Sequence, residues 1–234
     1  KRRKDEDTFF NSDNGDSISM LTEIQVEQED MQVDFDKEIP VLPLRNLAMF
    51  PMVVMPVTIG RSSTLKLVNA AYKKKHPIAV MSQISSDTDD PGYHDLYHVG
   101  VIARILRIFD MPGGNTTVVM QSYGPKVHLD SITRMQPYLQ GMVTPIEETL
   151  INEHTEEFKA LMDTTKDLAM KYVSMSERMT PDISIVIKSQ EGELLVNFIC
   201  ANFPFSVEEK NQLLKFDNVK ERIYRLIQIM NREV

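Results

Sequence analysis

Short apolar runs interrupted by prolines dominate the first half of this chain. Residues 39–61 hold two such runs, divided by Pro43, Pro51 and Pro56. Proline lacks a backbone N–H and fixes φ at about −65°, so these runs do not suit a helix or a flat central strand. Their β-branched and apolar residues suit short, bent strands of a curved sheet. A small barrel or roll is the expected product.

The spacing after residue 61 predicts one helix and then further strands. Leu65, Val68 and Tyr72 form an apolar face, Ser62 precedes it as the expected N-cap, and Lys73 begins a basic stretch that suits a helix C-terminus. A polar, Asp-rich loop is expected at residues 85–92 and a hairpin turn at residues 112–115. Strands are predicted over residues 78–81, 99–109, 116–120, 127–129 and 138–145. They would complete a six-stranded barrel.

From residue 151 onward the spacing becomes helical. One long amphipathic helix is predicted from apolar residues at heptad-like spacing, with Thr165 in the skipped position: Phe158, Leu161, Leu168, Tyr172 and Met175. A second helix ends before Pro204, and Ser206-x-x-Glu209 is a capping box that opens a third. The last helix carries an apolar stripe of Val219, Ile223, Leu226 and Met230. The second half is a predicted helical bundle, and the fold class is therefore α+β.

Charge is concentrated at the N-terminus. Residues 1–38 carry 12 acidic and 5 basic residues, whereas residues 39–234 carry 22 and 21. Such a polar, acidic segment is expected to be disordered. The nearly neutral body lacks the positive surface that phosphate binding requires, which argues against nucleic-acid binding. We predict a disordered acidic tail over residues 1–38, a β-barrel over residues 39–146 and a helical subdomain over residues 147–234.

The single cysteine and the absence of long apolar runs indicate where in the cell the protein is expected. Cys200 cannot form an internal disulfide, and its apolar neighbours predict a small core residue. No apolar h-region follows the basic residues 1–4, and no run approaches the roughly 18 apolar residues of a membrane helix. A cytoplasmic protein is the expectation.

Several short motifs occur in a characteristic order along the chain. They are IPVLPLRN at residues 39–46, then Phe50-Pro51, Met55-Pro56, Ile59-Gly60-Arg61, Asp90-Pro91-Gly92, His98-Val99-Gly100, Phe203-Pro204 and the run from Asp217 to Arg222. Their order resembles the N-terminal domain of the Lon family of ATP-dependent proteases, and the resemblance covers residues 39–234. The sequence departs from the family pattern at one point. Family members usually carry a glycine and then a basic residue after this strand, whereas here the glycine, Gly124, is displaced. This displacement predicts a differently bent strand corner.

The resemblance implies a PUA-like barrel or roll of six strands, followed by a helical bundle. It implies that the parent protein is an ATP-dependent serine endopeptidase that uses ATP and Mg, assembles as a homohexamer, and degrades misfolded, abnormal and selected regulatory proteins in quality control and stress response. The AAA+ module and the Ser-Lys dyad would lie outside this chain. The fragment is expected to recognise unfolded or tagged substrates and to support assembly, with no catalytic, cofactor or metal site of its own.

One segment of the sequence resembles a catalytic zinc-binding motif. His94-Asp95-Leu96-Tyr97-His98 resembles the zinc motif H-E-x-x-H, but Asp replaces Glu and the flanking glycines place it at a loop-to-strand junction instead of on a helix. Satisfied loop histidines are the favoured interpretation. The chain has no Walker loop, and no serine lies in a recognisable nucleophile context.

Apolar residues near turns are the remaining candidates for binding. Flexible methionines suit contact with varied apolar segments, but strand alternation prevents Met49, Met52 and Met55 from facing one way, so core packing is favoured for each. Apolar residues beside a tight turn are harder to bury. The predicted substrate contacts are Phe109, Met111, Pro112, Phe50 and Met52.

Three alternatives remain open at this stage. A stand-alone Lon-type adaptor or ligand-binding module would lack the motor that the family carries downstream. A metallohydrolase built on His94 and His98 would bind stoichiometric zinc. An RNA-binding barrel is the third alternative, and the near-neutral charge of the body argues against it.

Overall fold

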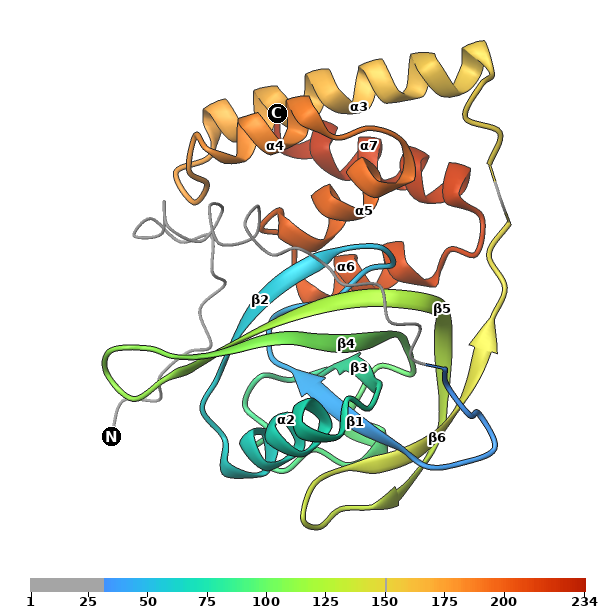
Figure 1. The fold of residues 1–234 in the computed structure, drawn as a ribbon. Helices are drawn as coiled ribbons and strands as arrows, with labels where there is room; N and C mark the ends of the chain where they lie inside the picture. The colour runs from blue at the N-terminus through green and yellow to red at the C-terminus, as the bar shows by residue number, and fades with distance from the viewer. Residues whose placement is uncertain (1–31, 150) are drawn as a thin grey trace.

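The structure, a computed structural model, describes residues 32–149 and 151–234. Its strands form one sheet, and most of its helices gather in a layer over one end of that sheet (Figure 1). The strands are β1 (Ile39–Leu44), β2 (Val54–Ile59), β3 (Ile78–Ser82), β4 (Val99–Asp110), β5 (Thr116–Arg134) and β6 (Gln140–Ile146). All lie where the apolar runs predicted strands.

The sheet curls into a roll. β1 pairs in parallel with β3 and antiparallel with β6, β3 pairs with β4, and β4 pairs with β5. Because β5 also pairs with β6, the pairings run in a ring through these five strands. β2 adds to the first half of β5 as an edge strand. The predicted barrel or roll of six strands is therefore confirmed as a roll.

β5 is one long strand where two were predicted. It bends where Ala103 lies opposite Ser122 and Val101 lies opposite Lys126, so that three residues of β5 face one of β4. Gly124, in the middle of this insertion, has φ 71°, a left-handed conformation that glycine adopts without strain. The displaced glycine thus marks the corner of β5, as a bulge in one strand turns it away from its partner.

A helix connects β2 to β3. α2 (Ser62–Lys74) buries Leu67, Val68 and Ala71, whereas Tyr72 is 42% exposed. The predicted N-cap at Ser62 is wrong by one residue: Arg61 occupies that position with an extended backbone and no side-chain cap. A short 3-10 turn, η1 (Tyr93–Asp95), precedes β4.

The C-terminal half is a bundle of α3 (Glu156–Met175), α4 (Ile183–Ser189), α5 (Gly192–Asn202), α6 (Val207–Lys215) and α7 (Val219–Glu233). The hydroxyls of Thr155 and Ser206 and the amide of Asn218 accept backbone N–H bonds and cap α3, α6 and α7. In Figure 1, α3 forms the outer edge of the bundle and α6 lies against the strands. The bundle is confirmed, and α4 is the helix that the spacing did not predict.

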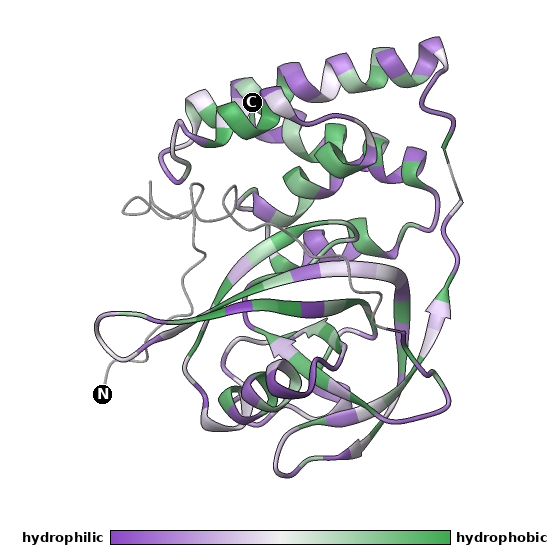
Figure 2. Ribbon diagram, viewed as in Figure 1, coloured by the Kyte–Doolittle hydropathy of each residue, from purple (hydrophilic) through white to green (hydrophobic). Residues whose placement is uncertain are grey.

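The larger apolar core is shared by the sheet and the bundle. It contains Phe50 and Met120 from the β-rich half together with Phe203 and Ile223 from the helices. Figure 2 shows α5 as largely hydrophobic, since it lies between the outer helices and the strands. A second, smaller cluster around Val41 and further strand residues lies within the roll. The core is therefore continuous across the predicted boundary at residues 146 and 147.

The predicted tail lies mostly outside the described residues, which begin at residue 32. Of its last residues, Val33 and Phe35 are partly buried against the smaller core cluster. The folded body therefore includes residues on the N-terminal side of the predicted boundary at residue 38. Among the described helices, none combines the length and the apolar character needed to cross a membrane.

Candidate functional site

The hairpin between β4 and β5 projects from the roll (Figure 1). At its tip the Met111 N–H donates to the Asn115 carbonyl over 2.9 Å, and Gly113 and Gly114 take the left-handed conformations that the tight turn requires. Pro112 is exposed, whereas Phe109 and Met111 are partly exposed. The hairpin thus places these three predicted contact residues together at one projecting end.

The loop between β1 and β2 separates the other two candidates. Phe50 is completely buried, and the Arg222 guanidinium lies 6.0 Å from its ring centre. No substrate can reach it there, so the structure removes Phe50 from the predicted contacts. Met52, two residues later, is 50% exposed and has φ 69°, a conformation uncommon for a residue other than glycine. Met49 and Met55 are buried, as the core interpretation predicted.

A buried lysine connects the sheet to the bundle. The Lys126 side chain, on β5, is fully buried, and its Nζ donates to the carbonyls of Leu214 and Phe216 over 2.7 and 3.0 Å. The same Nζ contacts Asp217 Oδ1 at 2.9 Å and Glu148 Oε1 at 3.2 Å. Because a buried ammonium is stable only when paired and hydrogen-bonded, these contacts hold the α6–α7 turn on the strand.

A buried arginine completes this junction from α7. The Arg222 side chain is fully buried and donates to Glu148 Oε1 over 2.6 Å, to Asn197 Oδ1 over 2.9 Å and to the carbonyls of Leu213 and Phe216. Asn197 in turn donates to the Pro51 carbonyl over 3.0 Å. The network therefore runs from the helices to the loop that carries Met52, and it fixes the position of that loop.

The two histidines of the imitated zinc motif are held by aromatic contacts. His98 stacks on Tyr93 with ring centres 4.0 Å apart, and its Nε2 lies 2.9 Å from the Tyr93 carbonyl. His94 lies edge-on to Tyr93. Within residues 32–149 and 151–234, no three His, Cys, Asp or Glu side chains are close enough to hold a metal ion. These contacts support loop histidines over metal ligands.

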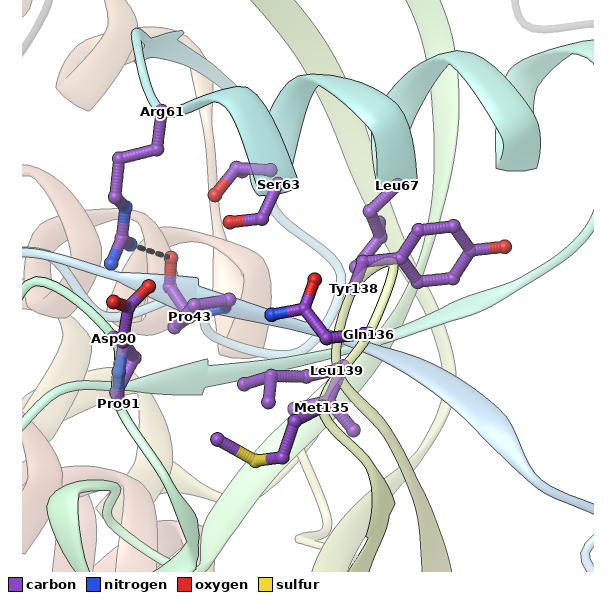
Figure 3. A pocket seen from close by; sticks show the side chains of 12 residues that line it. Pro43, Arg61, Ser63, Leu67, Asp90, Pro91, Met135, Gln136, Tyr138 and Leu139 are labelled. Atoms are coloured by element: carbon purple, nitrogen blue, oxygen red, sulfur yellow. Dashed lines mark hydrogen bonds between the residues drawn. The ribbon is translucent and has the colours of Figure 1, made fainter.

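Two hollows in the described part of the chain contain polar side chains. Figure 3 shows a small pocket between α2, β1 and the β5–β6 turn, in which Arg61 donates to the Pro43 carbonyl over 3.4 Å. Its volume of about 50 Å³ has room for a few water molecules. Ser63 lines it, but no histidine or lysine lies among the lining residues to activate the hydroxyl. A wider groove at the ends of α3 and α7 holds the Tyr172 hydroxyl bonded to Glu233.

Two buried polar side chains lie close together inside the bundle. Burial raises the pKa of the Cys200 thiol to about 12, so the residue is an inert core thiol, as predicted. Burial also lowers the pKa of Lys210 to about 8, although its Nζ donates to the Ala201 carbonyl over 2.7 Å. Neither group opens to a pocket described above, so we assign them to the core.

Sequence reasoning predicted the hairpin turn but not the charged junction between the sheet and the bundle. Lys126 and Arg222 are ordinary charged residues in the sequence, and charged residues are usually exposed. Strand alternation gave no signal for its burial, because Lys126 lies on the opposite face of β5 from the apolar Val127 and Leu129. The backbone that covers Lys126 comes from Leu214 and Phe216, far away in the sequence.

Comparison with known proteins identifies the family. The family model of the ATP-dependent protease La (Lon) substrate-binding domain matches residues 38–232. The Lon protease of Parabacteroides distasonis is 41% identical over 220 residues, and that of Flavobacterium johnsoniae is 34% identical over 218 residues. These alignments cover 92% and 93% of this chain but 26% of each relative. The chain therefore spans about a quarter of the length of these curated relatives.

Solved structures support the same fold. The N-terminal domain of a Mycobacterium avium complex Lon protease superposes with a TM-score of 0.64 at 22% identity, covering 85% of this chain and 100% of that one. A Lon N-terminal domain protein from Xanthomonas campestris gives 0.58 at 13% identity, covering 82% and 98%. The match over residues 38–232 confirms the resemblance carried by the proline-rich opening and the C-terminal helix: this chain belongs to the family of Lon protease substrate-binding domains.

Proposed function

We propose that this chain is the substrate-recognition part of an ATP-dependent serine protease of the Lon type. The observation that supports this most strongly is the family match over residues 38–232, together with relatives that are themselves Lon proteases. ATP hydrolysis with Mg and peptide cleavage by a Ser-Lys dyad belong to modules outside this chain. The chain itself binds unfolded or tagged polypeptides and catalyses nothing.

The proposed partners are substrate polypeptides and the other subunits of a homohexamer. Contacts at each subunit are weak, and assembly raises the effective concentration of binding surfaces around a substrate. The nearly balanced charge of residues 39–234 argues against nucleic acid as a further partner. A single cysteine buried in the core is compatible with the reducing cytoplasm.

We assign substrate contact to the hairpin tip and to Met52. Apolar side chains at a projecting turn meet an unfolded chain without a rearrangement of the core, and Phe109, Met111 and Pro112 meet this condition. Met52 adds a flexible thioether on a loop that the Arg222 network holds in place. These four residues are the proposed contact surface.

Binding of an unfolded polypeptide to variants of the tip tests this function. Phe109→Ser and Met111→Ser should weaken binding of reduced, carboxymethylated lactalbumin while thermal stability stays nearly unchanged. Met175→Ser is the matched control, because Met175 is also exposed but lies on α3 in the bundle. Unchanged binding in both hairpin variants would remove the tip from the site, and unfolding of either variant would assign its residue to the core.

A further inference from the structure

β4 extends well beyond the strand that pairs with it on one side. The pairing with β3 ends where Ile78 lies opposite Ala103, but β4 continues to Asp110. Over residues 107–110 its described strand partner is β5 alone, so in the described part of the chain the other edge of β4 has no strand paired with it there. Figure 1 shows this segment as one side of the projecting hairpin.

The backbone groups that point out from this edge follow from the hairpin geometry. The Met111 N–H donates across the hairpin to Asn115. Because successive residues of a strand point their N–H and C=O groups to opposite sides, Phe109 also faces β5, whereas Ile108 and Asp110 face away. These two residues offer a short ladder of donors and acceptors to an added strand.

The opposite edge of the same three-stranded region is blocked. The Val53 carbonyl accepts from Ser122 of β5, so by the same alternation Pro56 points away from β5. Proline has no N–H, and it is one of the residues by which proteins protect an exposed edge from strand addition. Residues 104–110 contain no proline. The chain therefore carries a proline on the β2 edge, whereas β4 carries none between its β-bulge at Ile105 to Arg107 and its end at Asp110.

We propose that the edge of β4 over residues 107–110, beyond its β-bulge, binds extended segments of substrate polypeptides by adding them as a further strand. The inference rests on the proposed function, because it is the substrate-binding role of the family that makes an unfolded polypeptide the occupant. Backbone pairing reads the main chain and tolerates many sequences. The partly buried Leu106 and Ile108 and the nearby Phe109 then favour segments with alternating apolar residues, and prolines in the segment oppose binding.

A proline placed on this edge removes a donor without breaking the sheet. In Asp110→Pro the lost N–H faces away from β5, so the pairing with Thr116 should remain. Asp110→Ala is the control for the side chain, because it keeps the N–H. Thr58→Pro is the control for proline on an edge, because Thr58 faces outward from β2 by the same alternation.

The binding assay uses the whole chain and reduced, carboxymethylated lactalbumin as the probe. Asp110→Pro should weaken binding about fivefold, the effect of one lost backbone hydrogen bond, while both control variants bind like the parent. Equal binding by Asp110→Pro and the parent would overturn the strand-addition mode while leaving the proposed function intact. Absence of binding by the parent chain would instead refute the proposed function.

Amide hydrogen exchange provides a second, independent measurement. On addition of the same polypeptide, the N–H groups of Ile108 and Asp110 should gain protection, whereas that of Phe109, which already faces β5, should change little. Protection of Ile108 and Asp110 in the chain without polypeptide would mean that another segment or a second copy already occupies the edge. That result would also overturn the proposal.

Discussion

The charged junction between the sheet and the bundle gives the sharpest stability prediction. In Arg222→Met the Leu213 carbonyl and Asn197 Oδ1 lose the donor that each receives from Arg222. Glu148 and the Phe216 carbonyl keep Lys126 as a partner, at 3.2 and 3.0 Å. Two buried acceptors without donors cost about 1–3 kcal/mol each.

We therefore expect Arg222→Met to lower the free energy of unfolding by about 3–5 kcal/mol, the range found when one partner of a buried ion pair is removed. This is a large share of the roughly 5–15 kcal/mol that stabilises a typical domain. Urea unfolding followed by circular dichroism measures the change. Arg225→Met on the same helix is the control, because its partly exposed guanidinium bonds to Gln228 on the surface and should matter little.

The shared acceptors also predict non-additive behaviour. In Lys126→Met, Arg222 still donates to Glu148 and to the Phe216 carbonyl. In Arg222→Met, Lys126 still contacts the same two acceptors. The double variant leaves both acceptors without either cation, so its loss should exceed the sum of the single losses by about 1–3 kcal/mol. Additivity of the two losses would show that the two cations do not back each other up at the shared acceptors. An Arg222→Met variant as stable as Arg225→Met would show that the junction does not depend on the Arg222 contacts.

Three further predictions concern the core, the sheet and a helix cap. The pKa of Lys210 in the folded chain is about 8, below its value in the unfolded chain. Between these two pKa values the unfolded chain binds more protons than the folded chain. The free energy of unfolding should therefore rise with pH by up to about 3 kcal/mol between pH 8 and 10.5. Urea unfolding across that range should show this rise in the parent and in Lys215→Met, which changes an exposed lysine, but not in Lys210→Met. Gly100→Ala should lower the free energy of unfolding by about 1–3 kcal/mol or more, because the new Cβ would lie 2.1 Å from the Val80 carbonyl oxygen. Gly60→Ala is the control, because its Cβ would meet no atom within 4 Å. Equal melting temperatures of the two variants would contradict this prediction. Ser206→Ala should cost about 1 kcal/mol through loss of the bond to the Glu209 N–H, and Ser189→Ala, exposed at the end of α4, serves as its control in the same melts.

The local pattern of the sequence was sufficient for the elements. Prolines and β-branched residues located the strands, the Pro-Gly-Gly turn located the hairpin, and the Ser206 cap and the apolar stripe of α7 located two helices. These predictions succeeded because turn chemistry, capping and periodicity act over a few residues. The position of the hairpin tip, with its apolar residues near the surface, followed from the same local reasoning.

The spacing predicted the buried stripe of α7 correctly but the buried face of α3 only in part. On α3 the buried residues include Met162 and Ala169, whereas Met175, predicted to lie on the apolar face, is 57% exposed. Phe158, Thr165 and Tyr172 are buried as predicted, and packing of α3 against α7 and α4 decided the remaining positions. The unpredicted α4 supplies part of that packing surface.

Tertiary structure alone determined which of four residues are buried and which is exposed: Phe50, Met52, Lys126 and Arg222. Phe50 and Met52 lie two residues apart in one apolar run, yet one is covered by the bundle and the other is exposed where the backbone turns at φ 69°. Lys126 and Arg222 are buried because residues far away in the sequence supply their carboxylate and carbonyl partners. Local pattern fixes where strands and helices form, but burial depends on which distant surface arrives, and only the folded chain specifies that.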